Sequence, residues 1–137
     1  MDATKPMATW KLVLLWALTA LLAAFFLVAG GSKLTSSASS SANFARWGYP
    51  GWFMYVVGVI EAGGAIALLV PRLAGFAAAL LCGTMVGAAL THLAHGETTA
   101  APVPLVLLAL VALVGYARRA PVLALVTRLK PSSRTVR

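Results

Sequence analysis

A single glutamate lies in the middle of a long apolar stretch. Glu61, in the sequence GVIEAGGAI, is the only charged residue between Gly51 and Pro71. A carboxylate at the centre of a bilayer costs at least ~2.5 kcal/mol, so such an acid is expected to hold a proton or to pair with a cation. Glu61 is therefore the candidate catalytic residue, able to exchange a proton with a ligand or to bind a polar headgroup.

Two other interpretations of Glu61 need no ligand. A protonated Glu61 can donate a hydrogen bond to a backbone carbonyl or to Thr84, and so hold two membrane helices together. It can also form a contact between subunits. All three interpretations are compatible with the sequence.

Other polar and aromatic residues that could bind a ligand are expected on one side of Glu61. They are Lys33 at the end of the first apolar run, Arg46 and Trp47 in the next loop, and His92 and His95 at the end of the third run. When the apolar runs are folded as antiparallel helices, these residues share one end of the molecule. We expect an outward-opening cavity with Lys33, Arg46 and His92 at its mouth and Glu61 at its floor.

Neither a metal site nor a haem is expected. His92 and His95 are three residues apart on one helical face, and Glu97 follows them, but three ligands at one helix end are a weak signal for a metal. Both histidines are on the same run, so they cannot oppose each other across a haem. Cys82 is the only cysteine, which leaves no disulfide and no CxxC pair.

The elements that must position these residues are membrane-spanning helices. The chain has 137 residues, of which 61% are hydrophobic and 10% charged, with a mean hydropathy of +0.90. Four apolar runs approach the ~20 residues that a spanning helix needs: residues 12–31, 52–70, 73–93 and 101–117. The expected fold is an all-α integral membrane four-helix bundle over residues 1–117, followed by a basic, partly amphipathic tail over residues 118–137.

The positions of the basic residues predict the orientation. Four spans place both termini on one side, which would carry Lys5, Lys11, Arg72, Arg118, Arg119, Arg128, Lys130, Arg134 and Arg137, against Lys33 and Arg46 on the other. Positive charge favours the cytoplasmic side. We expect cytoplasmic termini in the plasma membrane, and we attribute the basic excess to this topology rather than to nucleic-acid binding. Residues 120–130 are expected to be either an interfacial helix or a disordered tail, with disorder favoured after Pro131.

Loops and glycines give further expectations. SSASSSA is typical of a low-complexity linker, whereas NFARWGYPGWFMY, with its six aromatic residues, predicts an aromatic belt or a lid over the cavity. The second run contains Gly58, and the third contains Gly83 and Gly87 at GxxxG spacing. We expect these two glycine faces to meet and the first and fourth spans to lie toward the lipid.

The order of several short motifs resembles a known family. FFLVAGGSKL, then FARWGYPGWFMYVVGVIEAGGAIALLVP, then MVGAALTHL, together within about residues 12–117, are similar to the DoxX-like family of small four-helix membrane proteins. The resemblance implies a four-helix bundle and a link to quinone-coupled redox chemistry, because the family includes a DoxD-type subunit of thiosulfate:quinone oxidoreductase. Other relatives resemble membrane partners or assembly factors. The matching polar positions are Lys33, Glu61 and His92.

Two main functions are therefore expected. The first is a membrane subunit that binds a quinone or similar lipid and serves a redox partner protein, as an accessory subunit of a quinone-linked oxidoreductase. Glu61 would exchange the proton, while Lys33 or His92 binds the oxygen nearer the surface. The alternative is a non-enzymatic scaffold or assembly factor for another membrane protein. An acid–base enzyme acting on a lipid and a small transporter are weaker alternatives. The expected partners are the bilayer and a protein, either another chain or a second copy.

Overall fold

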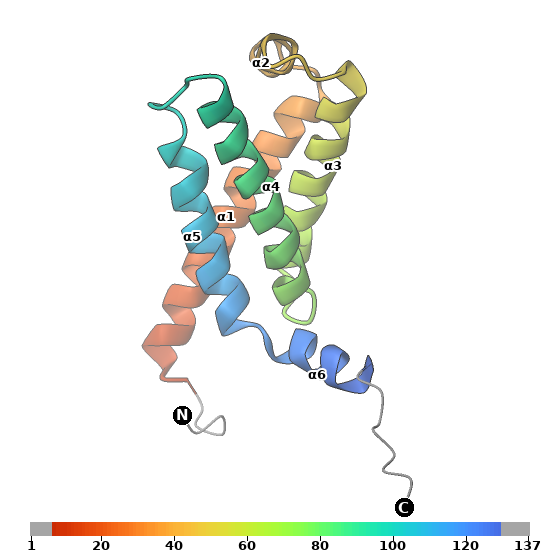
Figure 1. The fold of residues 1–137 in the computed structure, drawn as a ribbon. Helices are drawn as coiled ribbons and strands as arrows, with labels where there is room; N and C mark the ends of the chain where they lie inside the picture. The colour runs from red at the N-terminus through yellow and green to blue at the C-terminus, as the bar shows by residue number, and fades with distance from the viewer. Residues whose placement is uncertain (1–6, 130–137) are drawn as a thin grey trace, which may run out of the picture.

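The computed structural model describes residues 7–129, and every regular element in that range is an α-helix (Figure 1). The helices are α1 (Thr9–Leu34), α2 (Ala38–Arg46), α3 (Gly51–Leu68), α4 (Ala74–Ala94), α5 (Pro102–Ala117) and α6 (Ala120–Leu129). The predicted all-α fold is confirmed. We call the two ends of the molecule the α2 end and the α6 end.

Three of the helices are long and apolar enough to cross a membrane. They are α1, α3 and α4. The fourth candidate is α5, whose 16 residues make it about 24 Å long. It is long and apolar enough to cross a membrane only when it is counted together with α6, and the two helices are bent by 68° at the break between them. The described chain therefore has three or four candidate spans.

The serine-rich stretch is a helix, and the prediction of a linker there was wrong. Ser37 caps α2, since its hydroxyl accepts a hydrogen bond from the backbone N–H of Ser40 at 3.3 Å. Phe44 is buried and contacts the rings of Trp47, Tyr49 and Phe53. A cap and one aromatic anchor are enough to fold a short polar helix against the ends of the longer ones.

Gly58 of α3 packs against α1 rather than α4. A Cβ on Gly30 would lie 2.6 Å from the backbone nitrogen of Ala62 and 2.8 Å from the oxygen of Gly58, so the two backbones are almost in contact. Gly83 and Gly87 of α4, by contrast, have no atom within 4 Å of the Cβ they lack. The expectation that Gly58 meets the GxxxG face of α4 was wrong, because α1 occupies that position.

The packed core and the open space occupy different halves of the molecule. Buried side chains of α1, α3, α4 and α5 form one cluster, whose largest fully buried members are Phe26, Leu68, Leu81, Val111 and Val114. Where α3 approaches α4, Gly64 fits against Leu81. Toward the α2 end, α3 and α4 diverge (Figure 1), and this divergence leaves the space described below.

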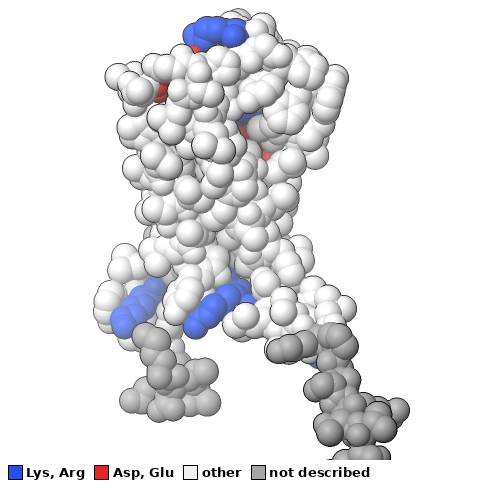
Figure 2. Space-filling view, viewed as in Figure 1, with Lys and Arg blue, Asp and Glu red and all other residues white. Residues whose placement is uncertain are grey.

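The α6 end carries most of the described basic residues (Figure 2). The Arg118 guanidinium lies 4.4 Å from the centre of the Trp16 ring, and that of Arg119 lies 3.9 Å from the Tyr116 ring. None of the α6 residues is buried. Of the two interpretations of the tail, the described part is helical, and the expected disorder after Pro131 lies outside the described residues.

The contact between α1 and α3 predicts a specific sensitivity at Gly30. In Gly30→Ala, the new methyl group meets backbone atoms of Ala62 and Gly58 that cannot rotate away. We expect the free energy of unfolding to fall by about 1–3 kcal/mol, measured by thermal or denaturant unfolding in detergent micelles.

The adjacent Gly31→Ala is the matched control for this change. Its Cβ meets nothing within 4 Å, and alanine is the better helix former by up to ~1 kcal/mol. Its stability should equal or exceed that of the wild type. Equal losses in the two variants would show that the close approach at Gly30 is not what limits stability.

Candidate functional site

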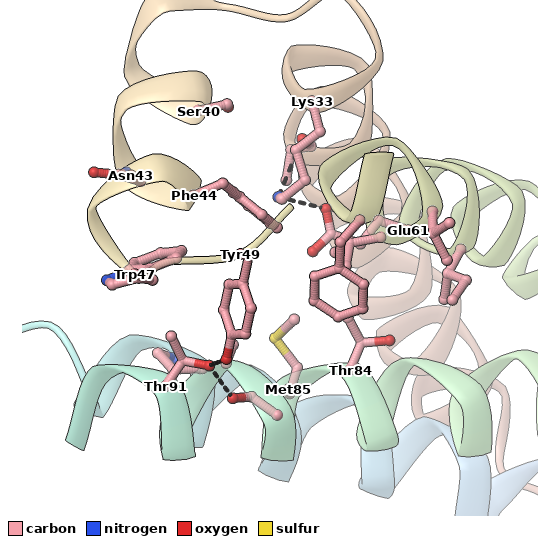
Figure 3. Close-up of a pocket in the computed structure, with 18 of the residues that line it drawn as sticks. Lys33, Ser40, Asn43, Phe44, Trp47, Tyr49, Glu61, Thr84, Met85 and Thr91 are labelled. Atoms are coloured by element: carbon pink, nitrogen blue, oxygen red, sulfur yellow. Dashed lines mark hydrogen bonds and ion pairs between the residues drawn. The ribbon is translucent and has the colours of Figure 1, made fainter. Parts of the chain in front are cut away.

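A cavity of about 410 Å³ lies between α1, α3 and α4, beneath α2 (Figure 3). Its walls are largely apolar and include Phe53, Val56, Ile60 and Met85. Polar side chains also reach it, from Lys33, Ser40, Asn43, Trp47, Tyr49, Glu61, Thr84, Thr91 and His92. A mainly apolar space with a small number of converging polar groups is the usual form of a small-molecule site.

The strongest polar feature of the cavity is an ion pair. The Nζ of Lys33 lies 2.7 Å from Oε2 of Glu61, and the exposed fractions of the two side chains are 17% and 5%. Lys33 also donates to the carbonyl oxygen of Ala29 at 3.4 Å. The Thr84 hydroxyl donates to the backbone oxygen of Leu80 on its own helix, and the side-chain hydrogen bond of Glu61 is with Lys33. The carboxylate is therefore balanced by a cation from the neighbouring helix.

The sequence creates this pair through helix geometry. Gly58 lies beside Lys33, with only 3.0 Å between the Cβ of the lysine and the Cβ that the glycine lacks. Glu61 is three residues further along α3, almost one turn toward the α6 end. A long helical side chain leans toward the N-terminus of its own helix, which for Lys33 is the same direction. The ammonium group thus descends to the level of the carboxylate.

A second charged cluster lies at the α2 end and is centred on Glu97. Oε1 of Glu97 lies 2.6 Å from Nη2 of Arg46 and accepts a hydrogen bond from Nε1 of Trp47 at 3.2 Å. Oε2 lies 2.6 Å from Nδ1 of His92. Glu97 thus ties the end of α2 to the end of α4. From the sequence, Glu97 was only a weak candidate metal ligand, and its role between the two helix ends was missed.

Two matching helix ends position the residues that close the cavity. After α2, Gly48 has a φ of 74°, and the N–H of Tyr49 donates to the oxygen of Phe44. After α4, Gly96 has a φ of 72°, and the N–H of Glu97 donates to the oxygen of His92. Both are Schellman motifs, in which a left-handed glycine reverses the chain. Tyr49 and Glu97 occupy the same position after the two glycines.

Tyr49 forms the second link across the cavity. Its hydroxyl lies 2.7 Å from that of Thr91, and the Thr91 hydroxyl donates to the oxygen of Gly87. Since Thr91 has only one hydroxyl proton, Tyr49 is the donor in their hydrogen bond. The segment from α2 to α3 is therefore bonded to α4 through Trp47 and Tyr49, and covers the cavity at the α2 end.

The structure gathers most of the predicted site residues, but not all. Lys33, Trp47, Glu61 and His92 line one cavity. Arg46 does not line it: its side chain is 60% exposed and is paired with Glu97. His95 is exposed, and its Nδ1 contacts the backbone oxygen of Thr91. Within residues 7–129, no group of three or more His, Cys, Asp or Glu side chains is arranged to hold a metal ion.

Together, the apolar helices and the cavity with its ion pair define a small helical multi-pass membrane protein. The sequence profile of the DoxX-like family matches residues 17–114, a range that contains Lys33, Glu61 and His92. The chain therefore belongs to the DoxX-like family. No curated protein and no solved structure gives a significant match.

The Glu97 cluster predicts an acid-sensitive closure of the α2 end. The hydrogen bond with His92, followed by those with Trp47 and the charge of Arg46, lowers the pKa of Glu97 below its ordinary value of 4.5. A carboxylate whose pKa is lower in the folded state than in the unfolded state stabilises the fold at pH values above the unfolded-state pKa. This stabilisation is lost as the pH falls through the folded-state pKa. Hydrogen exchange of the α2 amides should therefore accelerate below about pH 4.5.

The matched variant for this prediction is Glu97→Gln. It keeps the shape of the side chain and removes the titrating group. Its α2 amides should exchange faster than those of the wild type at neutral pH, with little further acceleration toward acid. If the wild type and the variant showed the same pH profile, Glu97 would not be the group that holds α2.

Proposed function

We propose that the chain crosses the plasma membrane four times, with both termini in the cytoplasm. The described basic residues support this orientation. Lys11, Arg72, Arg118, Arg119 and Arg128 belong to segments at the α6 end, whereas Lys33 and Arg46 belong to the α2 end (Figures 1 and 2). The excess of positive charge marks the cytoplasmic face. In this arrangement α5 is the fourth span, and α6 bends away to lie along the membrane surface, with its apolar residues toward the lipid.

We propose further that the cavity binds the headgroup of a quinone or similar lipid. The observation that carries this proposal is the ion pair of Lys33 and Glu61 in a largely apolar space of about 410 Å³. That volume is within the range of small-molecule pockets, about 300–1,000 Å³. The aromatic and aliphatic walls suit a flat ring, and the two charged groups suit the oxygen atoms at its edge.

The ion pair suggests what each residue does in a redox cycle. An ammonium donates hydrogen bonds and accepts none, so Lys33 would bind a quinone carbonyl oxygen. The carboxylate of Glu61 is an acceptor, so it would bind the hydroxyl of the reduced ring. Full reduction of a quinone adds two electrons and two protons. Glu61 would relay protons to or from the ring oxygen, while the electrons pass between the quinone and a redox partner protein.

This function predicts that Glu61→Gln distinguishes the two redox states of a quinone. The amide keeps the size of the side chain but is a poor substitute for a charged acceptor. Hydrogen bonds to charged groups contribute about 1.5–3 kcal/mol, so the Kd of the hydroquinone should rise by about tenfold or more. The Kd of the quinone should rise less. Binding can be followed by quenching of tryptophan fluorescence, because Trp47 lines the cavity.

Arg72→Gln provides the control, since it removes a charge in the turn between α3 and α4, far from the cavity. Thermal unfolding of both variants separates loss of binding from loss of fold. Unchanged hydroquinone binding in a folded Glu61→Gln variant would remove Glu61 from the site. If the wild type binds no quinone and purifies with a stoichiometric membrane protein, the scaffold or assembly function is the correct one.

A further inference from the structure

On the side of the cavity between α3 and α4, α4 contributes two glycines, which have no side chains to close it. Gly83 and Gly87, one turn apart on α4, both line the cavity, are exposed, and have no atom within 4 Å of their missing Cβ. On α3, Val56 lines the same cavity and is 42% exposed. Figure 2 shows a hollow on this face in which acidic and basic atoms are visible together. Lys33 and Glu61 are the ion pair that lines the cavity there.

The α2 end of the same cavity is covered. Trp47 and Tyr49 bridge from the segment after α2 to α4, through Glu97 and Thr91. The ring of Trp47 also meets the ring of His92 edge-on, with 5.2 Å between their centres. The sequence predicted that the cavity opens at the α2 end. That end instead carries the bonds of Trp47 and Tyr49, and none of these bonds crosses the side between α3 and α4.

The open side lies at membrane depth. Glu61 is ten residues from the start of α3, or about 15 Å along the helix, and Gly87 is seven residues from the end of α4, or about 10 Å. The hydrocarbon core of a bilayer is ≈ 30 Å thick, so the glycine gap faces lipid tails rather than water. A water-soluble ligand has no direct path to this opening.

From these observations we infer that the ligand reaches Lys33 and Glu61 sideways from the bilayer, through the gap at Gly83 and Gly87. The inference rests on the proposed function in taking the ligand to be a lipid, and it goes further in specifying its class. The ligand is an amphiphile dissolved in the membrane, whose polar head reaches the ion pair while its hydrocarbon tail extends between α3 and α4 into the lipid. The missing side chains of the two glycines are the opening through which the tail passes.

The route can be tested without any quinone, by carbodiimide modification of the two described glutamates. A carbodiimide adds to a protonated carboxyl group, whose proton moves to a carbodiimide nitrogen, and gives an O-acylisourea. When the amine of Lys33 attacks this group at Glu61, an amide bond forms and a urea leaves. The full-length chain in liposomes would be treated with dicyclohexylcarbodiimide, which partitions into lipid, or with a water-soluble carbodiimide, and each glutamate analysed by peptide mass spectrometry.

Lateral access predicts that Glu61 and Glu97 react preferentially with different carbodiimides. The lipid-soluble reagent should modify Glu61, or cross-link it to Lys33, at least about tenfold faster than the water-soluble reagent does, a ratio that needs only a small difference in barrier. Glu97, whose side chain is 21% exposed at the α2 end, should prefer the water-soluble reagent and so provides an internal control. Faster modification of Glu61 by the water-soluble reagent would overturn the inference.

Filling the gap should remove the preference. In Gly83→Leu/Gly87→Leu, the new side chains occupy open space, and modification of Glu61 by the lipid-soluble reagent should slow by about tenfold while that of Glu97 is unchanged. Gly63→Leu is the matched control, because Gly63 is exposed on α3, has equally open space and does not line the cavity. An unchanged rate at Glu61 in the folded double variant would also overturn the inference.

These outcomes are separable from those of the proposed function. If the lipid-soluble carbodiimide reaches Glu61 through the gap but no quinone binds, the lateral route is correct and the ligand is a different membrane amphiphile. Quinone binding with no effect of the glycine substitutions on either reagent would leave the proposed function in place and reject the route.

Discussion

The arrangement of the helices depends on the need to balance one carboxylate inside an apolar protein. An isolated charge at the position of Glu61 is unfavourable in a medium that cannot solvate it. Lys33 provides the balance only because α1 and α3 approach closely enough for its ammonium group to reach the carboxylate. The approach requires Gly30 and Gly58, where any side chain would meet the opposite backbone. Removing one partner of such a pair costs more stability than the intact pair contributes, because the remaining charge stays buried without a partner.

The close contact between α1 and α3 determines where the cavity lies. Because Gly58 faces α1, the small residues of α4 have no glycine face to pack against. Small-residue motifs in membrane helices usually mark a helix contact, but at Gly83 and Gly87 they mark the absence of one. The packed core occupies the half of the molecule toward α6, where Gly64 and Leu81 fit together. In the other half, α1 and α3 stay in close contact at Gly30 and Gly58, whereas the segment before α3 is joined to the end of α4 by the polar bonds of Trp47 and Tyr49.

Composition and spacing were sufficient for the long helices but not for their packing partners. Runs of about 20 apolar residues predicted α1, α3 and α4, since the bilayer leaves few alternatives to a helix. Lys33 was one of the few basic residues expected at the same end of the molecule as the cavity above Glu61. Which glycine faces meet is a three-dimensional property, and sequence spacing alone assigned Gly58 to the wrong helix.

Local signals that identify the closure of the cavity were present in the sequence. A serine followed by a short amphipathic stretch indicates a capped helix, as Ser37 does for α2. A glycine after a helical run indicates a left-handed helix end, as Gly48 and Gly96 do. These signals locate Tyr49 and Glu97 just after two helices, but they do not show that the two helix ends face each other. That follows only once α2 is recognised as a helix and laid across the end of α4.

The two glutamates of the described chain differ in the medium around them, and this difference separates their roles. Glu97 is partly exposed, so its bonds to Arg46, Trp47 and His92 compete with water and weaken with salt and with acid. Glu61 and Lys33 are shielded, so their attraction is stronger and less sensitive to the solution outside. Conditions at the membrane surface can therefore loosen the segment that covers the α2 end without breaking the ion pair. Under the proposed function, closure toward water and recognition of a ligand from lipid can be altered independently, because each uses its own carboxylate.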